Sequence, residues 1–163
     1  MSTIIDTLVT DRTQADVERV KALAAKGFAA MTAAERAEWL AGMKGAYNAS
    51  DMNRVGTALN YLAARLAPVC GMSITWSAKT DWAVTDIITA SQAEAYRKQV
   101  QSIRDALAYP EGTPDVPGLD RLTYTGANDI ERILALCEEL IDNITKAFRH
   151  TGAAECAAGG LLT

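Results

Sequence analysis

Residues 47–66, YNASDMNRVGTALNYLAARL, constrain the fold more than any other part of this chain, because their apolar side chains recur at the spacing of one helix face. The intervals are four, three and four residues, at Val55, Leu59, Leu62 and Leu66. Such a stripe must be covered by another apolar surface. Ser50 or Asp51 is placed to cap the helix, and Pro68 disfavours helical conformation in the residue before it. We therefore expect a helix of about four turns that packs in a bundle.

Capping signals predict three further helices before the last part of the chain. In a capping box, the first side chain accepts a hydrogen bond from a backbone amide three residues later, and the side chain there bonds back to the first amide. Glycine just after an apolar stripe is a common helix end. The signals are Thr13 with a closing Gly27, the box Thr32 and Glu35 with a closing Gly45, and the box Ser91 and Glu94 with an end near Ala108.

The longest predicted helix begins at Thr125 or Asn128 and carries nearly three heptads of apolar residues. The pattern consists of Ile130, Ile133/Leu134, Cys137, Leu140/Ile141, Ile144 and Ala147/Phe148. It is typical either of a seam between copies of the chain or of a bundle helix inside a monomer. We expect a homo-oligomer. Residues 151–163, TGAAECAAGGLLT, are small and glycine-rich, which predicts a flexible or extended tail.

Residues 69–89 show a different period. Apolar Met72, Ile74 and Trp76 alternate with Ser73, Thr75 and Ser77, which indicates a strand, and Trp82 and Val84 favour a second extended segment. We therefore predict a mainly α fold, a helical bundle of about five helices with a small β-hairpin or extended arm around residues 69–89. It is expected to form a single domain over residues 1–150.

Composition and charge exclude several functions. An apolar fraction of 49% is that of an ordinary globular protein, and a net charge of −4 without any Lys/Arg-rich run argues against nucleic acid as a partner. No segment approaches the 18 apolar residues of a membrane span, and the first residues lack the features of a signal peptide. We expect synthesis in the cytoplasm and no membrane partner.

Motifs for catalysis and cofactor binding are missing from the sequence. It contains no glycine-rich nucleotide loop and no nucleophile elbow, and its one histidine and three widely spaced cysteines do not match a metal site. We predict no catalytic residue, no metal and no cofactor. A pair of carboxylates that converges only in three dimensions would escape this search, so a cell-wall hydrolase module remains the alternative.

Large apolar side chains are the remaining candidates for a functional surface. Trp76 and Trp82 lie in the predicted extended region, where they are either interface anchors or core residues. The heptad pattern supplies a second candidate surface. The predicted interface residues are Trp76, Trp82, Ile133, Cys137, Leu140 and Ile144.

Four collinear segments resemble a family of small structural proteins or domains from the tail-region genes of phages and prophages of Gram-positive gut bacteria. They are residues 11–27, 47–66, 79–87 and 122–134. The chain departs from the family pattern at Ile88, where a proline is common, and in the tail, which lacks an aromatic residue.

The resemblance implies a virion component of the tail, baseplate or an appendage, with other virion proteins as partners and no active site. A cytoplasmic adaptor protein is a further alternative. The matching motifs are those of packing and capping, so they support a structural role by association only.

Overall fold

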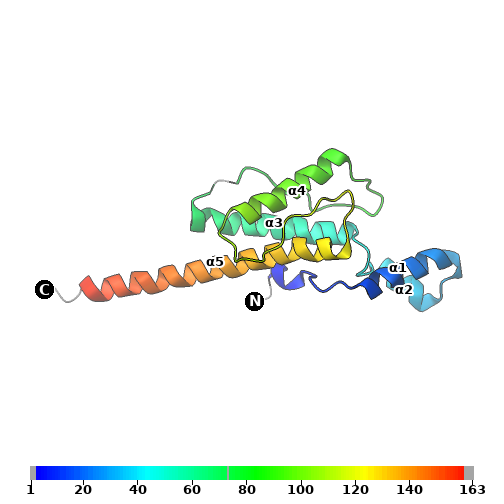
Figure 1. Ribbon diagram of the computed structural model, residues 1–163, viewed down its shortest axis with the longest axis horizontal. Helices are drawn as coiled ribbons and strands as arrows, with labels where there is room; N and C mark the ends of the chain where they lie inside the picture. The colour runs from blue at the N-terminus through cyan, green and yellow to red at the C-terminus, as the bar shows by residue number, and fades with distance from the viewer. Residues whose placement is uncertain (1–2, 73, 160–163) are drawn as a thin grey trace.

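A computed structural model describes residues 3–72 and 74–159, and within this part the chain forms five α-helices, two short 3₁₀ helices and no strand (Figure 1). Side chains are described as far as Phe148, except that of Cys70. The elements are η1 (Ile4–Thr7), α1 (Gln14–Lys26), η2 (Phe28–Ala30), α2 (Ala33–Leu40), α3 (Ala49–Cys70), α4 (Ala90–Asp105) and α5 (Tyr124–Gly159). The predicted mainly helical bundle of about five helices is confirmed.

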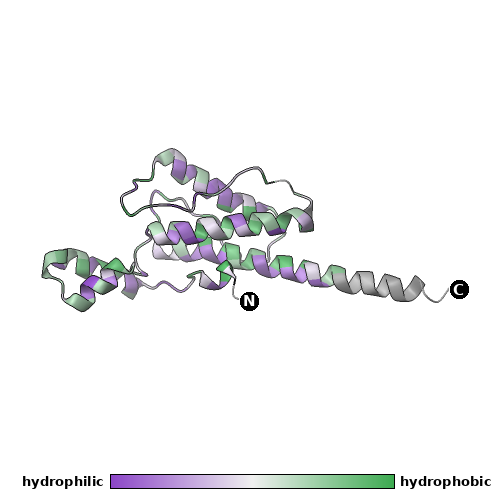
Figure 2. Cartoon of the chain, turned by 180° about the vertical axis from the view of Figure 1, so that it is seen from behind, coloured by the Kyte–Doolittle hydropathy of each residue, from purple (hydrophilic) through white to green (hydrophobic). Residues whose placement is uncertain are grey.

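The main core lies between α3, α4 and α5 (Figure 1). The predicted stripe of α3 is completely buried there, at Val55, Leu59, Leu62 and Leu66. Burial of each such side chain contributes roughly 1.5–3 kcal/mol, which outweighs any intrinsic helix preference. Seen from behind, hydrophobic and hydrophilic residues alternate along the coloured part of α5, as expected for a helix with one covered face (Figure 2).

The helices α1 and α2 form a separate hairpin with its own small core of Leu23, Met31 and Met43. The predicted start signals are confirmed, because Thr13 and Thr32 each cap a helix within a capping box. Gly27 closes α1 with a positive φ of 75°, a conformation that favours glycine. In Figure 1 this hairpin lies at one end of the molecule, and the last turns of α5 lie at the other.

Two helix starts differ from the predictions. Asn48, not Ser50 or Asp51, caps α3, and its side-chain oxygen accepts from the amides of both of those residues at 2.9 and 3.4 Å. The helix α4 begins earlier than predicted, because Thr89 and Gln92 form its capping box. In both cases several neighbouring polar residues are of the types that cap helices.

Three helix ends also differ from the predictions. The helix α2 ends at Leu40, before the predicted Gly45. The helix α3 continues through Pro68 to Cys70, which is possible because a proline in the last turn removes only one backbone hydrogen bond near the helix end. The helix α5 extends to Gly159, so the backbone of residues 151–159 is helical, not extended. Residues 160–163, the rest of the predicted tail, lie outside the described residues.

The predicted β-hairpin around residues 69–89 is wrong for the part that the structure describes, which contains no strand there. The segment after α3 instead lies along α3, where two asparagine side chains bond its backbone. Asn60 accepts from the amide of Ala78 at 2.7 Å and donates to its carbonyl at 3.0 Å. Asn53 bonds Trp82 in the same way, at 2.7 and 2.9 Å. The backbone therefore obtains its partners from side chains of a helix, where a hairpin would supply a second strand.

Gly56 lies between these asparagines and allows the closest approach of the segment to α3. A Cβ atom at this position would lie 2.3 Å from the carbonyl oxygen of Lys79. Real Cβ atoms do not approach a backbone oxygen so closely, so any larger residue would displace the segment.

We expect Gly56→Ala to lower the free energy of unfolding by about 2 kcal/mol, since the added methyl overpacks a backbone contact. Helix propensity alone predicts the opposite sign, a gain of about 0.5–1 kcal/mol. Urea denaturation measures the difference. The control is Thr57→Ala, an exposed change on the same helix that should alter stability by less than about 0.5 kcal/mol. A stabilised Gly56→Ala variant would contradict the described packing.

Candidate functional site

The two predicted tryptophan anchors are both packed against the chain itself. Trp76 is half-buried against the main core, and its Nε1 donates to Ser102 Oγ at 3.3 Å. Trp82 is 8% exposed, and Asn53 holds its backbone. The ammonium group of Lys79 lies 4.9 Å from the ring centroid of Trp82, within the range of a cation–π interaction. Neither indole projects freely into solvent.

The predicted seam of α5 is largely used inside the chain. Ile133 and Cys137 are completely buried in the main core. Leu140 and Ile144, farther along α5, are half-buried. The first part of the heptad pattern therefore packs a bundle, and only its later part offers accessible apolar surface. Self-association of the chain stays a prediction.

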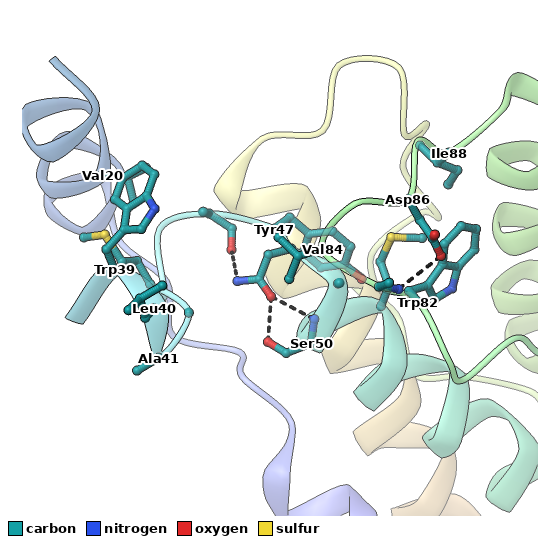
Figure 3. Close-up of a pocket in the computed structure, with 17 residues that line it drawn as sticks. Val20, Trp39, Leu40, Ala41, Tyr47, Ser50, Trp82, Val84, Asp86 and Ile88 are labelled. Atoms are coloured by element: carbon teal, nitrogen blue, oxygen red, sulfur yellow. Dashed lines mark hydrogen bonds between the residues drawn. The ribbon is translucent and has the colours of Figure 1, made fainter. Parts of the chain in front are cut away.

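A cavity of about 520 Å³ lies between the α1–α2 hairpin and the main bundle, and we call it the apolar groove (Figure 3). Its lining includes Val20, Trp39, Leu40, Tyr47, Trp82 and Val84. Three large apolar side chains at the groove are exposed to solvent: Leu40 is 74% exposed, Val84 95% and Ile88 36%. This volume is in the range of ligand-binding clefts, and the lining is mainly apolar.

Each wall of the apolar groove comes from a different part of the sequence. The α1–α2 hairpin supplies Trp39 and Leu40, and the segment after Trp82 supplies the opposite wall (Figure 3). Asp86 is the charged residue among those that line the groove. Its carboxylate accepts from the amide of Ala83 at 3.1 Å and lies 3.8 Å from the ammonium of Lys79. The carboxylate is thus already engaged by its own loop.

The connection between the hairpin and α3 is held by a close backbone contact. A Cβ on Gly45 would lie 2.1 Å from the carbonyl oxygen of Asp16, so glycine is required where the chain passes the start of α1. Beside it, Lys44 forms an ion pair with Asp11 at 2.7 Å. These contacts hold together the two ends of the hairpin, where it joins the rest of the chain.

Behind the groove, a buried ion network joins the N-terminal segment to α3 and α5. Nη2 of Arg12 lies 2.8 Å from Asp51 and 2.6 Å from Glu131. Arg54 also contacts both carboxylates, and Glu131 accepts from the amide of Val9 at 2.6 Å. Arg12, Asp51 and Glu131 are buried, and the two guanidinium groups balance the two carboxylates.

Tyr47 connects the network with the groove. Its ring lines the groove and lies 5.6 Å from the guanidinium carbon of Arg12. Its hydroxyl forms a short hydrogen bond with that of Tyr96. Burial raises the pKa of both phenols, so both stay protonated and one can donate to the other. Burial alone would lower the pKa of Arg54, but Glu131 and Asp51 together raise it above its ordinary value.

Asp51 and Glu131 are the kind of converging carboxylate pair that the hydrolase alternative requires. Both bond Arg12 and Arg54, and both are shielded from solvent, with Glu131 completely buried. A general acid or base must reach the substrate or an attacking water. This pair stabilises the packing of the segments and presents no oxygen to a substrate.

Among the described residues, no group of three or more His, Cys, Asp or Glu side chains is placed to hold a metal ion. The side chains of Cys70, His150 and Cys156 lie outside the described ones. No helix in the described part of the chain is long and apolar enough to cross a membrane.

The polar residues that organise the site were not among the predicted site residues. Glu131 follows directly after the buried Ile130. A charged residue at the edge of an apolar stripe indicates a buried charge, which requires an oppositely charged partner. Asn53, Gly56 and Asn60 recur three and four residues apart, the spacing of one helix face. That pattern of two amides around a glycine indicated a contact with another backbone.

No family model, no curated protein sequence and no solved structure matches this chain. The function is therefore inferred from its residues, from the geometry of the groove and from the resemblance of its sequence segments.

We expect Glu131→Gln to lower the free energy of unfolding by about 3 kcal/mol, because it leaves the buried guanidinium of Arg12 and the partly buried one of Arg54 with one carboxylate. The matched control is Glu38→Gln, which breaks the partly exposed pair with Arg19 at 2.7 Å. That change should cost less than about 1 kcal/mol. Urea denaturation of both variants measures the two costs, and equal values would contradict the role given to the buried network.

Proposed function

We propose that this chain is a structural component of a phage or phage-derived particle, located in the tail, baseplate or an appendage. It acts through protein–protein contacts and not as an enzyme. Its partners are other virion proteins and copies of itself, and it binds neither nucleic acid nor membrane. It is made in the host cytoplasm and then assembled into the particle.

One observation carries the protein-binding part of this proposal. Three of the six large apolar side chains that are exposed in the described part of the chain, Leu40, Val84 and Ile88, line the apolar groove, and a fourth, Ile87, directly precedes Ile88 in the sequence. Exposed apolar residues are ordinary when scattered, but a contiguous group marks an interaction site. The location in a virion comes from the resemblance of the four sequence segments and not from the groove.

The construction of the groove also favours protein binding. Asn53 holds the wall at Trp82 against α3, and the Gly45 contact holds the ends of the hairpin together, so each wall is ordered by contacts within the chain. A preformed surface avoids much of the entropy cost of ordering a loop on binding. Apolar side chains that project from this fixed frame can fill recesses on a partner.

The alternatives are less well supported by the geometry. A cell-wall hydrolase module needs an accessible acid pair, and the carboxylates of Asp51 and Glu131 are buried and bonded to arginines. A cytoplasmic adaptor would use the same groove but would not enter particles. The presence of the chain in particles therefore separates the adaptor from the virion component.

We expect the chain to co-sediment with particles purified by density gradient from the bacterium that encodes it, after induction. Mass spectrometry should find it in a fixed ratio to other particle proteins, while a cytoplasmic marker protein stays behind. Recovery of the chain only with the marker would contradict a virion role and support the adaptor.

Within the same preparation, Val84→Asp should lower incorporation into particles at least about tenfold, since a charge in an apolar contact costs more than 1.4 kcal/mol. The control is Thr85→Asp, which adds the same charge at the neighbouring exposed residue outside the groove lining. Equal incorporation of the two variants would contradict the groove as the assembly surface.

A further inference from the structure

We infer that the apolar groove receives the end of α5 from a second copy of the chain, so that copies join head to tail. This inference rests on the proposed assembly function and names the partner of the groove. The surface on one copy differs from the surface on the other, which makes the contact heterologous.

The groove and the end of α5 lie too far apart to meet within one chain. The groove lies beside the α1–α2 hairpin, at one end of the molecule, and α5 ends at the opposite end (Figure 1). The helix α5 has 36 residues and is therefore about 54 Å long. The two surfaces cannot meet within one chain, so the end of α5 reaches a groove only on another copy.

The length of α5 beyond the core carries the second step. Ile141 is the last α5 residue of the main core, and 18 residues follow it before the helix ends at Gly159, about 27 Å of helix. Phe148 on this part is 68% exposed. In proteins, most of the stability of a helix comes from packing of one face against another surface. A docked second copy would supply such packing for this part of α5.

The chemistry of the two surfaces carries the third step. Residues 151–163, TGAAECAAGGLLT, contain one charged residue, Glu155, and end with two leucines before the last threonine. The lining of the groove is mainly apolar, and its carboxylate, Asp86, is already bonded within its loop. The apolar groove and the weakly charged residues 151–163 are therefore complementary in composition.

This arrangement differs from the α5 seam that the heptad pattern predicts. A seam between equivalent α5 helices is isologous and does not involve Leu40 or Val84. A head-to-tail contact repeats, and it closes into a ring or continues as a filament, depending on the rotation between copies. Rings and tubes are the assemblies that a tail or baseplate component would build.

The test is light scattering coupled to size exclusion, with the full chain at several concentrations and with reductant. The wild-type mass should rise with concentration above the 17.4 kDa of one chain. The groove variant Leu40→Glu/Val84→Glu changes two exposed side chains, so it should fold normally and remain at one chain mass. The tail variant Ala154→Glu/Leu161→Glu should behave in the same way, and Thr85→Glu should keep the wild-type behaviour.

An equimolar mixture of the groove variant and the tail variant gives the decisive result. The groove variant keeps an intact tail, and the tail variant keeps an intact groove, so one chain of each can bind the other. The expected product therefore has twice the mass of one chain, and nothing larger forms. A mixture that stays at one chain mass, a groove variant that keeps the wild-type mass, or a wild type that is monomeric throughout would each overturn the inference. Incorporation into particles is measured independently of these masses. Failure of the head-to-tail contact can therefore be distinguished from failure of the proposed virion function.

Discussion

The contacts of Glu131 determine how the rest of this structure is arranged. One buried carboxylate on α5 bonds the amide of Val9, Arg12 in the N-terminal segment and Arg54 on α3. Three segments that are far apart in the sequence therefore meet at one group. Buried ion pairs often contribute little net stability compared with apolar packing, but an incomplete pair is costly. The network consequently specifies a single arrangement, because any other placement of these segments would leave a charge in the protein interior without its partner.

The groove depends on that arrangement. Arg12 lies against Tyr47, whose ring forms part of the groove, and the chain leaves Arg12 directly into α1 of the hairpin. The opposite wall is fixed to α3 by Asn53, which bonds the backbone of Trp82. The hairpin has its own small core, so its position relative to the bundle is set by these connections more than by a shared interior. A buried polar network and a buried amide contact thus keep an apolar surface open at the outside of the molecule.

The helical part of the fold could be predicted from the sequence, because each helix repeats its apolar residues at a period that only a helix can bury on one face. The caps were less certain, since Asn48, Ser50 and Asp51 are all good capping residues, and the structure has Asn48 as the cap. The hairpin prediction was wrong for a different reason. Alternation in Ile74, Thr75 and Trp76 indicates which side chains face the core, and the structure has Ile74 and Trp76 half-buried and Thr75 exposed. The alternation does not identify the hydrogen-bond partner of the backbone. The partners of the backbone were the side chains of Asn53 and Asn60 on α3. The groove could not be predicted because its two walls come from distant parts of the sequence and meet only after folding.

The most direct test of the groove as a contact surface is site-specific photo-crosslinking. A photoreactive phenylalanine derivative in place of Val84, which is 95% exposed, samples whatever occupies the groove without disturbing the core. The same group at Thr85 is the matched control. The account predicts crosslinks from position 84 to residues 151–163 of a second copy, identified by mass spectrometry of mixed isotope-labelled chains. Equal, weak labelling from positions 84 and 85, with no preferred peptide, would contradict it.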